Sequence, residues 1–111
     1  MTADDLWERH ADWWIDGFTA GADPEYTEQI LPLIAGGLTG ARQVLDIGCG
    51  DGQVARLAGQ LTGVERVVGV DPTWRQISVA HERGGALFAA AGAAALPFPD
   101  ASFDAAVACL V

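Results

Sequence analysis

The feature that most constrains the fold is an apolar segment that runs directly into three closely spaced glycines. Residues 44–47 (VLDI) lead into the loop 48–52 (GCGDG), and a helical pattern begins behind it. Residues without a Cβ let backbone approach a ligand closely at the start of a helix. A second apolar segment, residues 67–70, ends in Asp71, and a carboxylate there suits the two hydroxyls of a ribose. Together they predict a site for a nucleoside-containing cofactor.

From residue 42 onward, apolar segments alternate with helical patterns. We expect strands at about 43–47, 66–70, 86–90 and 103–111. The first, second and fourth are mostly apolar, as parallel strands buried on both faces are. Thr73 and Gln76 are typical of a capping box at the start of the second helix of this region. The order predicts an α/β fold with a doubly wound, mostly parallel sheet.

Residues 1–40 have a different character and predict a separate N-terminal helical cap, before a second region over residues 41–111. Trp7, Trp13 and Trp14 recur at roughly helical spacing. Pro32 falls inside a later helical pattern, so we expect a kink or two short helices there. We expect some aromatic side chains of the cap to pack on the domain and one or two to face the substrate pocket.

Composition excludes several classes of function. Fifteen acidic against six basic residues give a net charge of −9, which repels phosphate backbones and disfavours nucleic acid as a partner. No apolar run approaches the roughly 20 residues of a membrane-spanning helix, and no basic apolar leader opens the chain, so we expect no membrane partner and a cytoplasmic location. Cys49 and Cys109 predict buried, reduced thiols, and no Cys/His spacing indicates a metal site.

Two cofactor interpretations compete for the glycine loop. Gly50-x-Gly52-x-x-Ala55, with Asp71 downstream, matches a dinucleotide fingerprint with a pyrophosphate over the helix start. The alternative depends on Asp46, directly before the loop. A carboxylate beside the glycines repels a pyrophosphate but holds an ammonium group, directly or through water. This pattern indicates a ligand with a cationic amino-acid end and a ribose end, and S-adenosylmethionine has both.

A third motif favours the second interpretation. Residues 95–104 read ALPFPDASFD and lead into the fourth expected strand. With the glycine loop and the segment ending in Asp71, this region resembles the class I SAM-dependent methyltransferases, specifically the broad small-molecule group related to methyltransferase type 11. The resemblance covers residues 43–111. It implies a Rossmann-like sheet with the strand order 3-2-1-4-5-7-6, of which this chain encodes the first four strands, with the C-terminal strands missing.

The resemblance also implies roles for matching positions. Asp46 and the backbone of Gly48, Cys49 and Gly50 meet the methionine half of the cofactor, whereas the nucleoside half contacts Asp71, Pro72, Gly92 and Ala93. In that set Asp71 accepts from the ribose hydroxyls, and the other three lie against the adenine. The family often has an Asp at the position of Gly92, four residues before the Leu of LPF. One polar anchor is therefore absent, and we expect weaker cofactor binding.

The function that follows is SAM-dependent methyl transfer to a small-molecule acceptor. The chain carries most of a cofactor site and an incomplete acceptor site, so we expect it to be inactive alone. No residue is assigned as a catalytic base. An oligomer or a further C-terminal part is expected to cover the fourth strand. Two alternatives stay open, namely a nonenzymatic SAM-binding or partner module and an NAD-dependent oxidoreductase.

Overall fold

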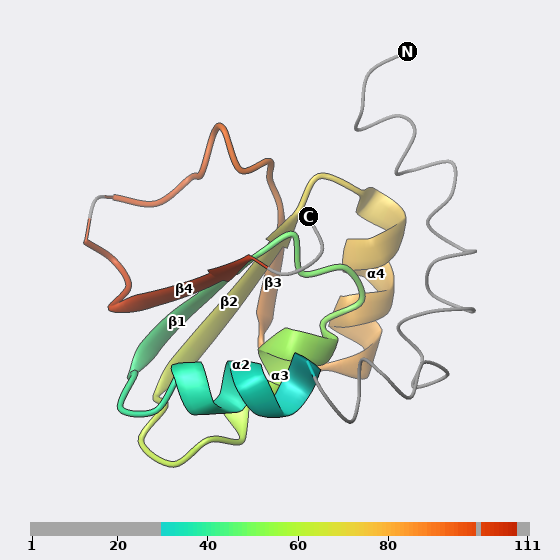
Figure 1. Cartoon of the computed structure of the whole chain (residues 1–111). Helices are drawn as coiled ribbons and strands as arrows, with labels where there is room; N and C mark the ends of the chain where they lie inside the picture. Colours follow the sequence, from blue (N-terminus) through green and yellow to red (C-terminus); the bar gives the residue numbers. More distant parts are fainter. Residues whose placement is uncertain (1–29, 100, 109–111) are drawn as a thin grey trace.

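The computed structural model describes residues 30–99 and 101–108 as a parallel sheet with helices (Figure 1). The elements in chain order are α2 (Leu31–Gly37), β1 (Gln43–Ile47), α3 (Gln53–Gly59), β2 (Arg66–Asp71), α4 (Trp74–Arg83), β3 (Leu87–Ala90) and β4 (Ala105–Ala108). The sheet order is β3-β2-β1-β4, and all three pairings are parallel. The predicted α/β fold is confirmed, and the order agrees with the first four strands that the resemblance implies.

The register of the sheet brings the ends of its strands together. Ile47 at the end of β1 pairs with Val70 of β2 and with Ala108 of β4, and Asp71 at the end of β2 pairs with Ala90 of β3. Because the strands are parallel, their carboxyl ends meet along one edge of the sheet. Ligands of open α/β sheets bind outside this edge, so it is the first place to look for a site.

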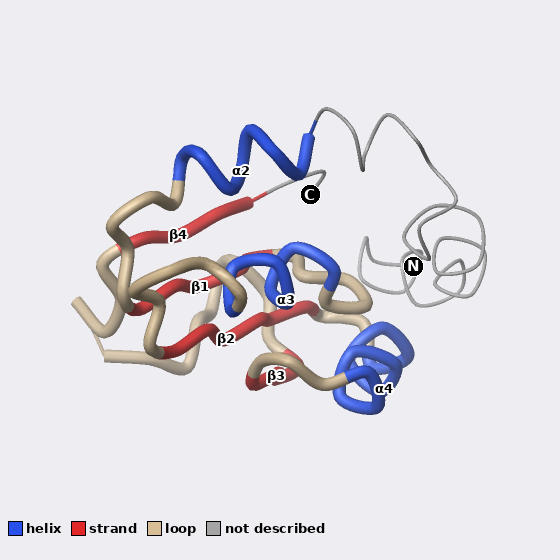
Figure 2. The backbone as a smooth tube through the Cα atoms, turned by 90° about the horizontal axis from the view of Figure 1, so that it is seen from below, coloured by secondary structure: helices blue, strands red, loops and turns tan. Residues whose placement is uncertain are grey.

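The two faces of the sheet are covered differently. Val44 and Val67 pack with α2, α3 and their neighbours, in a cluster with buried Leu38, Ala41, Ala55 and Ala58. The alternate residues Leu45, Val68 and Val70 face the other side, where Leu96, Phe98 and Phe103 from the β3–β4 loop pack on them. Figure 2 shows the four strands side by side with α2 and α3 over one face. Alternation along the strands thus supplies both halves of the core.

The fourth strand differs from its prediction. We expected an apolar strand buried on both faces, but Ala106 and Ala108 are exposed and Ala105 and Val107 only half-buried. The reason is topological, since β4 is an outer strand of the four and its far edge pairs with no strand in the described part of the chain. Residues 109–111, including Cys109, lie outside the described residues.

The described chain begins just before α2. Pro32 stands in the first turn of α2, a position that proline tolerates. The expected kink or pair of short helices involves residues before Ile30, which lie outside the described residues. Gly37 is the last residue of α2. The predicted helical cap falls mainly on residues 1–29, which lie outside the described residues.

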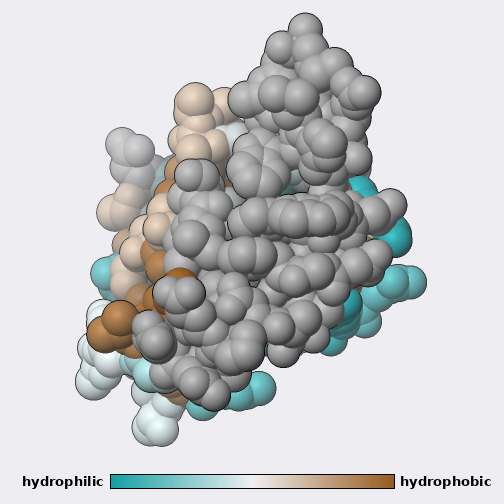
Figure 3. Space-filling view, turned by 45° about the vertical axis from the view of Figure 1, so that its right-hand side comes forward, coloured by the Kyte–Doolittle hydropathy of each residue, from teal (hydrophilic) through white to brown (hydrophobic). Residues whose placement is uncertain are grey.

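Hydrophobic residues gather on part of the surface. On the face shown in Figure 3 they lie at the left, and hydrophilic residues lie mainly at the right and below. Leu33, Trp74 and Leu87 are the large apolar side chains that stay exposed among the described residues. Within the same part of the chain, no helix has the length and apolar character needed to cross a bilayer.

Candidate cofactor site

The glycine loop after β1 adopts a backbone shape that other residues reach only with strain. The φ angles of Gly48, Gly50 and Gly52 are +73°, +56° and +93°. Positive φ is costly for residues with a Cβ, which explains a glycine at every second position. Gly52 has a second constraint, because a Cβ there would lie 2.7 Å from Phe88 Cζ. The loop therefore turns the chain from the end of β1 into α3, with Gly48 and Gly50 half-buried and the other three residues buried.

Four backbone N–H groups of this loop donate within the protein. The N–H groups of Gly48 and Cys49 donate to Val70 O at 2.8 and 2.9 Å, and that of Gly52 donates to Cys49 O at 3.0 Å. The N–H of Gly50 donates to the Asp71 carboxylate. A pyrophosphate needs free N–H donors in such a loop, as phosphate-binding loops provide. These four N–H groups are already bound, so the loop is poorly suited to that group.

Asp71 lies at the tip of β2 and joins the loop to α4. Its Oδ2 accepts the Gly50 N–H at 3.0 Å, and its Oδ1 accepts the Thr73 N–H at 2.9 Å. The side chain is buried, with 8% of the residue exposed. A carboxylate has about four acceptor sites, so two of them stay free for donors of a ligand. Asp71 thus lies between the glycine loop and the start of α4.

Asp46 lies at the same edge, in β1, and is buried with 2% of the residue exposed. Its Oδ2 has no hydrogen-bond partner. Burial raises the pKa of Asp46 to about 7, the negative charge of Asp71 acts in the same direction, and the backbone N–H of Ala55 opposes both. An unpaired buried carboxylate is costly, and a nearby positive charge would favour its ionised form. This arrangement suits a cationic ligand.

A second buried carboxylate, Asp51, stands inside the glycine loop and is completely buried. Its Oδ2 forms an ion pair with Nη1 of Arg83, the last residue of α4, and its Oδ1 has no partner. Nη1 of Arg56, in α3, donates to the backbone O of Asp51 at 2.8 Å. Burial lowers the pKa of Arg56, the charge of Asp51 opposes this shift, and that of Arg83 adds to it. Two helices thus hold the centre of the loop.

Cys49 fills a tight space beneath the loop. It is buried and free, as predicted for this thiol. Burial raises the pKa of its thiol, and the charges of Asp46 and Asp71 add to the effect. The neighbouring strand leaves no room beside it, because a Cβ on Gly69 would lie 2.9 Å from both Cys49 Cβ and Phe88 Cδ1. A thiol held protonated in this packing serves as a small core residue and not as a nucleophile.

The predicted capping box at the start of α4 is wrong. Thr73 is the N-cap residue, but its side chain makes no capping hydrogen bond. Its backbone N–H binds Asp71, and its side chain is buried. Gln76, the other predicted member, is also buried and faces Gly50, with Oε1 3.7 Å from the position of a Cβ there and without a partner. Both side chains are buried in the tertiary structure and form no capping box.

The remaining predicted site residues lie around the same edge. Pro72 is half-buried directly after Asp71. Gly92 and Ala93 follow β3, whose continuation Ala91 donates its N–H to Asp71 O at 3.0 Å. Gly92 is half-buried and Ala93 is exposed, and a Cβ on Gly92 would meet nothing within 4 Å. The sheet therefore brings the ends of β1, β2 and β3 together at one site.

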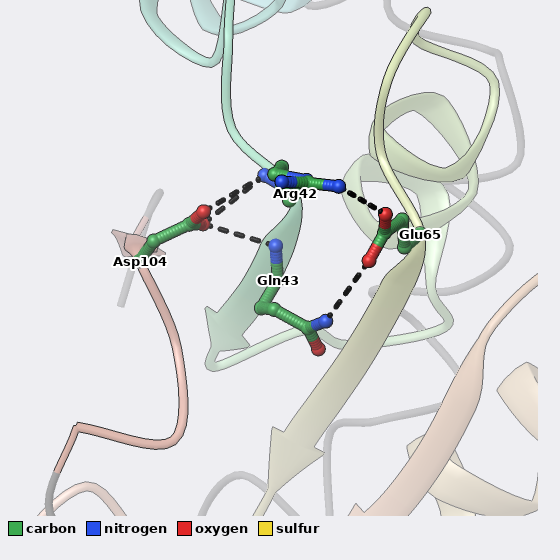
Figure 4. A network of polar contacts seen from close by, with 4 residues as sticks. All are labelled: Arg42, Gln43, Glu65 and Asp104. Atoms are coloured by element: carbon green, nitrogen blue, oxygen red, sulfur yellow. Dashed lines mark hydrogen bonds and ion pairs between the residues drawn. The ribbon is translucent and has the colours of Figure 1, made fainter.

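A second polar network occupies the opposite edge of the sheet (Figure 4). The Asp104 carboxylate accepts the backbone N–H groups of Arg42 and Gln43 at 3.0–3.1 Å, and Arg42 pairs with Glu65 at 2.7 Å. Asp104 thereby ties the start of β4 to the start of β1. His81 is exposed on α4.

Sequence reasoning missed three of the residues around the loop, Asp51, Arg56 and Arg83. An acid between two close-approach glycines was a usable local signal for Asp51. The arginines carry no local signal, because Arg83 lies 32 residues away from its partner along the chain. Among the described residues, no three His, Cys, Asp or Glu side chains gather in a way that would hold a metal ion.

Comparisons with known proteins gave consistent matches. A family model described as a methyltransferase domain matches residues 44–111. The YcgJ protein of Bacillus subtilis has 31% identity, with 70% of this chain and 36% of that chain covered and a TM-score of 0.64. A SAM-dependent methyltransferase of Thermotoga maritima, described as a possible histamine N-methyltransferase, has 26% identity, 95% and 44% coverage and a TM-score of 0.63.

A third solved structure contains a bound ligand. PKMT2 of Rickettsia typhi, in complex with AdoHcy, has 25% identity, with 75% of this chain and 19% of that chain covered and a TM-score of 0.50. No curated protein matched the chain. The chain spans less than half the length of each of these three solved structures.

Proposed function

The chain belongs to the methyltransferase domain family, and on that premise we propose that it binds S-adenosylmethionine at the carboxyl edge of its sheet. The ligand reported with the Rickettsia typhi protein, AdoHcy, supports this cofactor. Because the chain spans less than half of these relatives, methyl transfer is proposed for the whole protein of which these residues form the cofactor-binding part.

One observation carries the choice of cofactor, namely that the site offers acceptors where a dinucleotide needs donors. The N–H groups of Gly48, Cys49, Gly50 and Gly52 donate within the protein, whereas Oδ2 of Asp46 is buried without a partner. A ligand with a cationic amino-acid end relieves the unpaired carboxylate, and a pyrophosphate adds negative charge beside it. The same observation disfavours the NAD-dependent alternative.

The proposed contacts divide between the two halves of the cofactor. Asp46 acts on the ammonium end through a water molecule or through its field, since its side chain is too deeply buried for broad direct contact. Asp71 accepts from the ribose hydroxyls with the acceptor sites that Gly50 and Thr73 leave free. The adenine lies against Pro72 and the backbone at Gly92 and Ala93. Gly48, Cys49 and Gly50 present their backbone to the methionine half.

The cofactor supplies a methyl group on a sulfonium, which an acceptor atom displaces. The residues of this chain bind and orient the cofactor, so that displacement proceeds in line, and they keep water from the sulfonium. A small-molecule acceptor is the proposal that the Thermotoga maritima relative supports, because it is described as a possible histamine N-methyltransferase. Asp46 and Asp71 need not exchange protons with the acceptor for this role.

Calorimetric titration of the 111-residue chain tests the proposal. We expect S-adenosylmethionine to bind and NAD to give no heat of binding. Asp46→Asn is expected to weaken S-adenosylmethionine while leaving the fold intact, because the variant keeps the shape of the side chain. Asp104→Asn, at the opposite edge, is the matched control and should leave the affinity unchanged. Binding of NAD with no binding of S-adenosylmethionine would refute the proposal.

The nonenzymatic alternative makes a different prediction. A SAM-binding module that functions with a partner requires a stable assembly that covers the open edge of β4. Size-exclusion chromatography with light scattering distinguishes the two, since the cofactor-binding part of an enzyme needs no such assembly to bind its ligand. We expect binding of S-adenosylmethionine by the monomer.

A further inference from the structure

The glycine loop is held at its centre by an ion pair between a loop residue and an arginine that lies outside both the motif and the helix that follows it. Asp51 is completely buried between Gly50 and Gly52, and its Oδ2 pairs with Arg83 at the far end of α4. The other carboxylate oxygen is buried without a partner. A buried carboxylate is strongly unfavourable without its counter-ion, so Arg83 provides the main compensation for placing a charge here.

A second arginine fixes the backbone at the same residue. Arg56 donates to the backbone O of Asp51 at 2.8 Å, and Gly85 leaves the space for it, because a Cβ there would lie 2.7 Å from Arg56 Cγ. Gly85 stands two residues after Arg83, just beyond the end of α4. Asp51 therefore binds two arginines: Arg56 from α3 at its backbone and Arg83 from α4 at its side chain.

These contacts at Asp51 are needed because the loop is rich in glycine. Gly50 and Gly52 lose more conformational freedom on ordering than other residues, so a loop that contains them is ordered only by contacts made from outside. Asp71 holds the side of the loop toward the nucleoside half, through the Gly50 N–H. The contacts at Asp51 are made one residue further on, between Gly50 and the start of α3.

We infer that Arg83, acting through Asp51, is a positioning residue that preorganises the glycine loop for the methionine half of the cofactor. This inference rests on the proposed function. The ion pair holds the loop in its binding conformation before the ligand binds. The entropy lost in ordering the loop therefore does not reduce the binding free energy. The nucleoside half depends on Asp71 and is independent of the pair. Loss of the pair should therefore weaken the binding of ligands that contain the methionine half more than the binding of ligands that contain only the nucleoside half.

The test compares two ligands that differ in the amino-acid end. S-adenosylmethionine has that end, and 5′-methylthioadenosine has adenine, ribose and a thioether without it. Arg83→Met leaves a buried charge unpaired, so the double variant Asp51→Asn/Arg83→Met is the safer probe of the loop. Arg83→Lys keeps the charge and tests rescue. Arg42→Met removes an exposed ion pair with Glu65 at the opposite edge and serves as the control for loss of an arginine remote from the loop.

The expected result is a selective loss of affinity measured by titration calorimetry. The double variant should bind S-adenosylmethionine at least about tenfold more weakly, which equals about 1.4 kcal/mol, and 5′-methylthioadenosine within about twofold of the wild type. Arg83→Lys should recover part of the loss, and Arg42→Met should show none. Urea unfolding of each variant checks that the protein is folded under the conditions in which its affinity is measured.

Two outcomes would overturn the inference while leaving the proposed function intact. Equal weakening of both ligands would mean that the pair only stabilises the fold. Unchanged affinity for S-adenosylmethionine would mean that the loop needs no such support. A wild-type chain that binds neither ligand would instead refute the proposed function, and with it this role of Arg83.

Discussion

The Asp71 carboxylate at the tip of β2 accepts the backbone N–H of Gly50, in the loop after β1, at 3.0 Å. Its second oxygen accepts the N–H of Thr73 at the start of α4. One buried side chain thus joins the loop after β1 to the turn between β2 and α4, 21 residues further along the chain. The ribose-binding carboxylate of the proposed site is also a structural clamp, and its substitution should affect stability and binding together.

Asp71→Asn is the first prediction. The amide retains one acceptor oxygen and places an NH₂ against the other backbone donor, so one N–H is left buried and unpaired. We expect the free energy of unfolding to fall by about 1–3 kcal/mol, measured by urea denaturation, and the affinity for S-adenosylmethionine to fall as well. Asp104→Asn removes a similar side chain-to-backbone contact at the opposite edge and should leave affinity unchanged. Equal affinity in both variants would contradict the proposed role of Asp71.

The second prediction concerns stability and the buried carboxyl of Asp46. Its pKa of about 7 in the folded protein lies above the ordinary value of about 4, so between these pH values the folded state binds a proton that the unfolded chain has released. Stability from this group is therefore present at low pH and is lost as pH rises from about 4 to about 7, with an upper bound of about 4 kcal/mol. Relative to Asp46→Asn, the wild type should lose stability over this range in urea titrations. A pH-independent difference would contradict the assignment.

Ligand affinity should have the opposite pH dependence. A cationic ligand favours the ionised form of Asp46 and so binds better once the carboxyl has lost its proton. We expect S-adenosylmethionine to bind up to about tenfold more tightly at pH 8 than at pH 6, measured by calorimetry, since a pKa near 7 separates the two conditions. Asp46→Asn should remove most of this dependence. An unchanged pH profile in the variant would show that another group is responsible.

A substitution at Gly92 is expected to strengthen the binding of S-adenosylmethionine. A Cβ there meets nothing within 4 Å, and the residue lies beyond β3, at the carboxyl edge of the sheet. Gly92→Asp should add a polar anchor for the adenine and strengthen binding of S-adenosylmethionine by about 0.5–1.5 kcal/mol, the net value of a typical hydrogen bond. Ala94→Asp adds the same charge two residues away and should have no such effect. If both substitutions strengthen binding equally, the gain is general electrostatic attraction.

Gly69 tests the packing beneath the loop. A methyl group at this position would lie 2.9 Å from Cys49 Cβ and from Phe88 Cδ1. Gly69→Ala should therefore lower the free energy of unfolding by about 1–3 kcal/mol through overpacking. Gly36→Ala, in α2, meets nothing within 4 Å and should raise it by about 0.5–1 kcal/mol, since alanine is the better helix former. Urea denaturation of both variants measures the contrast.

Much of the fold followed from local pattern. The expected strands at 43–47 and 66–70 agree with β1 and β2 to within one residue, because each is a short apolar run bounded by turn residues. The family expected from three motifs is confirmed by the match over residues 44–111. Phe98 and Phe103 of the third motif pack against the sheet, and their half-buried rings form an edge-to-face pair with centroids 5.2 Å apart.

Local pattern was insufficient where burial decided a side chain's partner. Thr73 and Gln76 have the spacing of a capping box, yet both are buried and make no cap. The apolar β4 resembled an interior strand, but its outer position in the described sheet leaves its residues half-buried or exposed.

By itself the sequence determined the elements of this protein and the glycine loop, because backbone conformation and alternation depend on residues close together in the chain. Only the tertiary structure decided which groups the loop meets. Asp51 finds Arg83 across 32 residues, and Asp71 finds Gly50 across 21. Such pairings depend on the order of the strands and on how the helices pack across the sheet. The sequence around either partner indicates neither of these.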